Sequence, residues 1–168
     1  RDPDGRLAFA APPLLRSGPV EPDLLDRVIA TLGVRAEQVV AAEWADNGPR
    51  WIGVLLGSAE EVLAVRPHPA KDLNIGIAGP HPPGSDVAWE VRTFFEAGGT
   101  ALVEDPITGS FNAALAQWLL RTGRAEAPYV AAQGTAIGRR GRVHVSGDAG
   151  EIWIAGATVT VIDGAAVV

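Results

Sequence analysis

The sequence predicts an α+β domain in which a curved sheet wraps around one central helix. The first observation is segment 111–122, which is apolar on nearly all faces, as is typical of a helix buried on every side. The second is its run of small side chains, Ala113, Ala114 and Ala116, which would let a sheet approach closely. The third is a series of short strand-like segments, bounded by Gly, Pro and Asn-Gly turns, on both sides of this helix.

The N-terminal quarter predicts one strand and one surface helix. Segment 6–11 (RLAFAA) predicts a strand that two prolines end. Segment 23–32 (DLLDRVIATL) has its apolar residues at helical spacing, with Pro22 before it and Gly33 after it. We expect this helix to pack one face on the sheet.

The middle of the chain alternates strand patterns with turns. Residues 46–49 (Asp-Asn-Gly-Pro) predict a tight turn between two of the strands. The predicted elements are strands at 38–44, 50–56, 73–78 and 87–95 and a short helix at 60–64.

The C-terminal part begins with the central helix, which we expect to end at Gly123. Strand patterns follow, centred on Tyr129, Val143, Ile152 and Val159.

Composition excludes several classes of function. The chain has 168 residues, 47% hydrophobic residues, a net charge of −6 and a pI near 5.0, so a nucleic-acid surface is not expected. It has no cysteine, which excludes disulfides and thiolate chemistry, and Lys71 is its only lysine. No apolar run is long enough for a transmembrane helix, so we expect no membrane partner and a cytoplasmic location.

Residues 104–112 (EDPITGSFN) carry the strongest signal for chemistry. They predict a loop that presents Asp105, turns at Gly109 and opens the central helix at Ser110. The first amides of a helix lack intrahelical acceptors and carry partial positive charge, so this turn could seat a carboxylate or a phosphate. The alternative is an ordinary turn-forming Asp followed by an ordinary helix cap.

The stretch EDPITGSFNAALAQWLL resembles the signature of the phenazine-biosynthesis isomerases, the PhzF-like family. Segments 79–99 (GPHPPGSDVAWEVRTFFEAGG), 133–145 (QGTAIGRRGRVHV) and 156–168 (GATVTVIDGAAVV) resemble the parts of that family around the signature. The similarity extends over most of residues 7–168.

The resemblance implies a diaminopimelate-epimerase-like fold, with a mostly antiparallel sheet around a central helix. Family members have two such domains with the active site between them. The resemblance and the absence of methionine lead us to expect that this chain is the C-terminal half. We expect residues 1–13 to hold the last strand of an N-terminal domain, 14–22 a linker and 23–168 the C-terminal domain.

The implied activity is a cofactor-independent isomerisation or epimerisation that moves a proton on a small carboxylate substrate. Asp105 and Ser110 are the catalytic candidates, and Gly109, Ser110 and Thr108 would bind the substrate, with Thr108 supporting the turn. The family's proton-shuttling glutamate lies in the N-terminal domain, so this chain alone should be inactive. The implied partners are an N-terminal half, in the same chain or as a separate subunit, and a second subunit in a homodimer or heterodimer.

Other mechanisms lack their motifs. His68, His81 and His144 do not have the spacing of metal ligands. Neither the serine-hydrolase elbow nor a dinucleotide-binding glycine motif occurs. The racemases of the same fold use a pair of cysteines, which this chain lacks. The alternative function is a non-catalytic subunit of the same fold that binds a carboxylate metabolite or serves as a scaffold.

Overall fold

The computed structural model describes residues 4–96, 102–148, 150–162 and 164–165. Its strands are β1 (Leu7–Ala10), β2 (Arg16–Pro19), β3 (Val39–Asp46), β4 (Trp51–Leu56), β5 (Ile75–Pro80), β6 (Trp89–Glu96), β7 (Leu102–Glu104), β8 (Tyr129–Gln133), β9 (Gly141–Asp148) and β10 (Glu151–Gly156). Its helices are α1 (Pro22–Leu32), α2 (Ala59–Ala64) and α3 (Gly109–Arg121), with 3-10 turns at Ala36–Gln38 and Thr135–Ile137.

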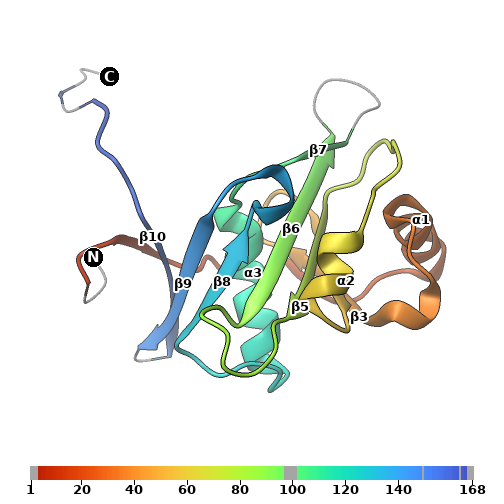
Figure 1. Ribbon diagram of the computed structural model, residues 1–168, viewed down its shortest axis with the longest axis horizontal. Helices are drawn as coiled ribbons and strands as arrows, with labels where there is room; N and C mark the ends of the chain where they lie inside the picture. Colours follow the sequence, from red (N-terminus) through yellow and green to blue (C-terminus); the bar gives the residue numbers. More distant parts are fainter. Residues whose placement is uncertain (1–3, 97–101, 149, 163, 166–168) are drawn as a thin grey trace.

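All strands belong to one sheet in the order β1-β10-β9-β8-β6-β5-β4-β3-β2, with β7 paired to the end of β6. Neighbouring strands are antiparallel except β4 with β5 and β6 with β8. The sheet curves around α3, which contacts β3 on one side and β9 and β10 on the other (Figure 1). The predicted α+β fold, a mostly antiparallel sheet around a central helix, is confirmed.

The helix α3 is buried because the sheet supplies space for its large side chains. Phe111, Trp118 and the small residues between them are almost fully inaccessible. A Cβ atom on Gly76 of β5 would lie 2.1 Å from the Phe111 ring, so glycine is required for this close approach. The helix ends at Arg121 with Thr122 as its C-cap, and Gly123 follows with a left-handed φ of 66°, in line with the predicted ending at Gly123.

A second core lies on the other face of the sheet, where α1 and α2 pack. Val28 and Leu32 of α1 and Val62 of α2 are completely buried there against Ile52 and Ile75. Figure 1 shows α2 in front of β5 and β6, with α3 behind the sheet and α1 at the far end. The two helical layers therefore lie on opposite faces of one sheet.

The predicted strand at Val159 is wrong. Residues 157–162 form no strand, and the Val159 side chain is 86% exposed. The physical reason is that β10 is already paired on both edges, with β9 and with β1. The segment that follows β10 therefore has no free edge of that strand on which to pair.

Two further differences lie near the helix start and the predicted linker. The central helix begins at Gly109, one residue before the expected Ser110. Within the predicted linker 14–22, β2 pairs with β3, so this segment is part of the sheet. The predicted strand at 6–11 is present as β1 and pairs with β10 of the same chain. The assignment of this strand to an N-terminal domain stays a prediction. So does the division into residues 1–13, 14–22 and 23–168.

Candidate active site at the N-terminus of α3

The loop from β7 to α3 brings Asp105, Thr108, Gly109 and Ser110 to one end of the central helix. The Asp105 backbone N–H donates to the Thr93 carbonyl at 3.1 Å, which keeps the loop attached to β6. Pro106 and Ile107 then turn the chain outward, and α3 starts at Gly109. The four predicted site residues therefore lie together, but their side chains face two different sets of partners.

Thr108 fixes the position of Asp105. The Thr108 hydroxyl donates to Oδ2 of Asp105 at 2.6 Å and lies 2.6 Å from the hydroxyl of Thr93. These contacts attach the Thr108 side chain to both Asp105 and β6. Because its hydroxyl is engaged in this way, Thr108 makes no side-chain cap on α3, although it occupies the N-cap position.

Gln133, at the end of β8, links the members of this network. Its Oε1 accepts from the Thr108 backbone N–H at 3.1 Å and from Nδ2 of Asn112 at 2.8 Å. Its Nε2 donates to the Thr93 hydroxyl at 3.1 Å and to the Asp105 carbonyl at 3.1 Å. Gln133 and Thr93 are fully buried. A buried network in which the polar atoms are paired holds its geometry strongly, because any rearrangement leaves groups without partners.

Ser110 is held from the opposite side by the start of β4 and the turn before it. The Trp51 indole N–H donates to the Ser110 hydroxyl at 3.0 Å, and Nδ2 of Asn47 donates to the Ser110 carbonyl at 2.8 Å. Trp51 is 4% exposed, and its ring lies edge-on to Phe111 at 5.7 Å. A serine hydroxyl that accepts from an indole keeps its own proton for donation. Within the described residues, the Ser110 hydroxyl has no acceptor.

The uncapped amides at the start of α3 make this end of the helix suitable for an anion. Gly109, Ser110 and Phe111 come first in the helix, and no side chain caps their amides in the part of the chain that the structure describes. Gly109 and Ser110 are partly exposed, whereas Phe111 is buried. They carry the positive end of the helix dipole. A Cβ atom on Gly109 would approach only the Phe9 ring, at 3.4 Å, so the backbone is accessible here.

An apolar cavity of about 380 Å³ adjoins Gly109. Its walls come from β1, β9, β10 and the loop before α3, and include Phe9, Ile107, Val143 and Ile154. A small molecule could place a carboxylate at the helix amides and its apolar part in this cavity. This combination of an apolar cavity with few polar groups is typical of small-molecule sites.

Glu104, the first residue of the EDPITGS stretch, is a structural residue. Its two carboxylate oxygens accept from Nε and Nη2 of Arg92 at 2.9 Å and 2.7 Å. Nη1 of Arg92 donates to the carbonyls of Val62 and Val65 at the end of α2. Arg92 is 4% exposed, so this buried pair fixes β7, and with it Asp105, against β6 and α2.

The sequence did not single out the residues that position the site, which are Asn47, Trp51, Thr93, Asn112 and Gln133. Four of them are polar or aromatic residues within strongly apolar segments, and a buried polar residue in such a segment needs a partner. Gln133 also opens the stretch 133–145 that carries part of the resemblance. These two sequence features could have pointed to the positioning residues. Neither feature predicts which residues contact one another in the folded chain.

The histidines do not gather into a metal site in the described part of the chain. His81 lies 3.0 Å from Oε2 of the buried Glu90, which is a pairwise contact. Within the described residues, no group of three or more His, Asp or Glu side chains could hold a metal ion. None of the helices in the described ranges is both long and apolar enough to cross a membrane.

A curved, mostly antiparallel sheet around a buried helix, with uncapped amides at the start of that helix, defines the class of protein. It is an α+β domain in which one sheet wraps around a central helix. Residues 11–164 match the family model PhzC-PhzF, described as phenazine biosynthesis-like protein. The chain therefore belongs to this family. Comparison with curated proteins gives no match.

Solved structures of this family have the same fold. The PhzF-family phenazine biosynthesis protein of Bacillus anthracis superposes with a TM-score of 0.69 at 15% identity, over 92% of this chain and 59% of that one. The Enterococcus faecalis PhzF-family protein gives 0.61 at 23% identity, over 89% and 52%. A predicted epimerase of Pseudomonas aeruginosa gives 0.63 at 17% identity, over 89% and 54%. The chain therefore spans between 52% and 59% of the length of these three proteins.

Proposed function

We propose that this chain supplies the carboxylate-binding part of a cofactor-independent isomerase or epimerase site. Membership of the PhzC-PhzF family and likeness to a protein called a predicted epimerase support an isomerase or epimerase. The observation that carries the proposal is the uncapped N-terminus of α3, where Trp51 orients the Ser110 hydroxyl and Thr108 holds the Asp105 carboxylate in the loop that precedes the helix.

In this proposal the substrate carboxylate binds to the amides of Gly109 and Ser110 and to the Ser110 hydroxyl. When a proton leaves the neighbouring carbon, negative charge builds on the carboxylate oxygens. Fixed donors that face this charge stabilise the transition state more than the ground state. Asp105, with Oδ2 held by Thr108, uses its other oxygen to orient the substrate or relay a proton.

The principal acid/base glutamate would come from an N-terminal half, on the same polypeptide or on a separate subunit. The length of the chain relative to its structural neighbours supports this arrangement. Exposed apolar side chains beside the cavity, Leu7, Phe9 and Ile107, form a surface that such a half or a second copy would cover. The isolated chain would then be inactive. We also propose that the protein is cytoplasmic.

The test is deuterium incorporation from D₂O into small carboxylates that have a proton on a carbon activated by the carboxylate or by a double bond. The protein is this chain joined with an N-terminal half of the family. Ser110→Ala should lower the exchange rate about 100-fold, the effect of losing one fixed donor at a developing charge. Asp105→Asn should lower it about 100-fold as well, because the amide cannot relay a proton. Ser85→Ala, in an exposed loop, is the matched control.

Two results would contradict the enzyme proposal. Exchange that is unchanged in both variants would remove Ser110 and Asp105 from the mechanism. Carboxylate binding without any exchange would instead favour the non-catalytic binding subunit of the same fold.

A further inference from the structure

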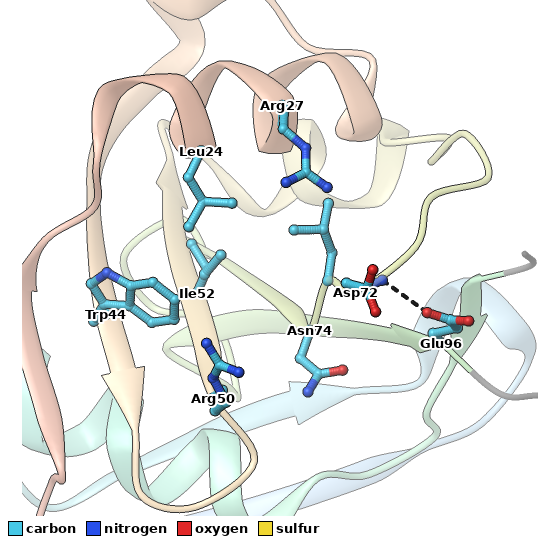
Figure 2. A pocket seen from close by; sticks show the side chains of 9 residues that line it. Leu24, Arg27, Trp44, Arg50, Ile52, Asp72, Asn74 and Glu96 are labelled. Atoms are coloured by element: carbon cyan, nitrogen blue, oxygen red, sulfur yellow. Dashed lines mark hydrogen bonds between the residues drawn. The ribbon is translucent and has the colours of Figure 1, made fainter.

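A second cavity, also of about 380 Å³, lies on the outer face of the sheet beneath α1. It is formed between α1, the start of β4 and the residues that precede β5 (Figure 2). The α3 site lies on the other face, because Trp51 faces α3 whereas its neighbour Ile52 lines this cavity. The two cavities share no lining residue.

Two arginines approach this cavity from opposite sides. Figure 2 shows the Arg27 side chain extending from α1 and the Arg50 side chain extending from the residue before β4. In the described ranges neither guanidinium lies within ion-pair distance of a carboxylate. Nη2 of Arg27 donates a hydrogen bond to the Lys71 carbonyl at 3.5 Å. Both are therefore available for an anionic group.

Carboxylates lie on a third side of the same cavity. Oε2 of Glu96 accepts from the Asp72 backbone N–H at 2.8 Å, the bond that is dashed in Figure 2. Among the residues that the structure describes, the Asp72 carboxylate has no hydrogen-bond donor or ion-pair partner. The cavity therefore presents separated groups of both signs, and a ligand with both signs would match it better than a simple anion.

The remaining wall is apolar and rigid. Leu24, Ile52 and the ring of Trp44 line it. Trp44 is fixed by a 3.0 Å hydrogen bond from its indole N–H to Glu21 and by the Arg16 guanidinium, 4.0 Å above its ring. An apolar side chain of a ligand would pack here.

The backbone is constrained at the cavity as well. Arg50 and Asp72 are the non-glycine residues with left-handed backbone in the described chain, with φ of 58° and 57°. A carboxylate holds each backbone N–H: Asp46 accepts from Arg50 at 2.9 Å, and Glu96 accepts from Asp72. Strained non-glycine residues that are held in place by other groups cluster at functional sites.

We propose that this cavity binds a small free α-amino acid with an apolar side chain. Its carboxylate binds Arg27 and Arg50, its ammonium group faces Asp72 and Glu96, and its side chain packs on Trp44 and Ile52. This site does not depend on the activity proposed for α3.

The experiment is calorimetric titration of the 168-residue chain with L-leucine, 4-methylpentanoate and 3-methylbutylamine. Leucine carries both charges, and each analogue lacks one of them. We expect saturable leucine binding that is at least about tenfold tighter than binding of either analogue. Arg27→Gln and Arg50→Asn should each weaken leucine binding about tenfold or more, since each removes a charged hydrogen-bond donor. Asparagine is chosen at position 50 because it tolerates a left-handed backbone.

Arg140→Gln is the matched control, because Arg140 is exposed and does not line the cavity. Unchanged circular dichroism of the variants establishes that they fold. Failure of leucine to saturate at millimolar concentration would overturn the proposal, as would leucine affinity that both arginine variants leave unchanged. Equal affinity for leucine and 4-methylpentanoate would also overturn it, because an anion site would then suffice.

Discussion

The N-terminus of α3 and the cavity beneath α1 use polar groups in opposite ways. At α3, Asp105, Thr108 and Gln133 bond to one another, so these side chains are fixed and the backbone amides with the Ser110 hydroxyl stay available. Beneath α1, the guanidinium groups of Arg27 and Arg50 have no carboxylate partner in the described structure. A paired buried network holds a site in position, whereas unpaired groups at a cavity are suited to contact a ligand.

The same contrast holds for arginines alone. Arg92 is buried, and its guanidinium bonds to Glu104 and to two carbonyls of α2, whereas Arg50 is exposed beside the outer cavity. We therefore expect substitutions in the paired regions to lower the free energy of unfolding strongly, and substitutions at the outer cavity to lower it little.

Arg92→Gln should have the largest effect. It leaves Glu104 buried without its charged partner and leaves the carbonyls of Val62 and Val65 unpaired. We expect the free energy of unfolding to fall by about 3–5 kcal/mol, measured by urea denaturation. Arg121→Gln is the control, because Arg121 pairs with Glu43 but is half exposed. Its loss should cost at most about 1 kcal/mol. Equal losses of unfolding free energy in Arg92→Gln and Arg121→Gln would contradict the expected difference between a buried and an exposed arginine pair.

Gln133→Leu tests the network that holds Asp105. The change leaves the Thr108 backbone N–H and the Asp105 carbonyl without a partner in a buried region. It also removes one hydrogen bond each from the Asn112 side-chain amide and the Thr93 hydroxyl, which keep their bonds to Thr108. We expect a loss of about 2–3 kcal/mol in urea denaturation. Gln117→Leu on α3, where the glutamine is only partly buried, should cost less than about 1 kcal/mol. A smaller loss for Gln133 than for Gln117 would show that the network does not stabilise the fold.

Trp51→Phe tests the orientation of the Ser110 hydroxyl. The variant keeps an aromatic ring beside Phe111 but removes the indole N–H. We expect about 1 kcal/mol less stability. The affinity for a small carboxylate at α3 should also fall several-fold, because the hydroxyl is no longer oriented. Trp153→Phe, on β10, should leave that affinity unchanged, because the Trp153 indole makes no hydrogen bond to Ser110 in the described structure. Equal affinities in the two variants would remove Trp51 from the site.

Arg50→Asn should have the smallest effect on stability. Among the residues that the structure describes, the Arg50 guanidinium has no carboxylate partner, and asparagine can adopt the same left-handed backbone. We expect a change of less than about 0.5 kcal/mol in the free energy of unfolding. A loss as large as that of Arg92→Gln would mean that the guanidinium bonds within the protein, which would contradict its availability for a ligand.

The sequence predicts most of the fold because the fold depends on local patterns. The all-round apolar character of 111–122, the spacing in 23–32 and the Gly123 ending each follow from one segment. The strand at Val159 fails for a non-local reason: its pattern is correct, but β10 has no free edge. The pairing of β2 in the predicted linker likewise depends on β3, which lies more than twenty residues away.

The candidate site is predicted only in its contiguous part. Asp105, Thr108, Gly109 and Ser110 stand in one loop, so a single motif identifies them. Trp51 and Gln133 reach that loop from distant strands, and the curvature of the sheet decides that they meet it. The roles of the loop residues in binding and catalysis stay predictions.

The most direct test of the central claim is an amide NMR titration of the ¹⁵N-labelled chain with isobutyrate. We expect saturable chemical-shift changes of the Gly109, Ser110 and Phe111 amides, and we expect these changes to be smaller in Ser110→Ala. The indole N–H signal of Trp44, which lines the outer cavity, shows whether isobutyrate also binds there. Saturable shifts confined to residues away from the start of α3, with those three amides unmoved, would contradict the assignment of the carboxylate site.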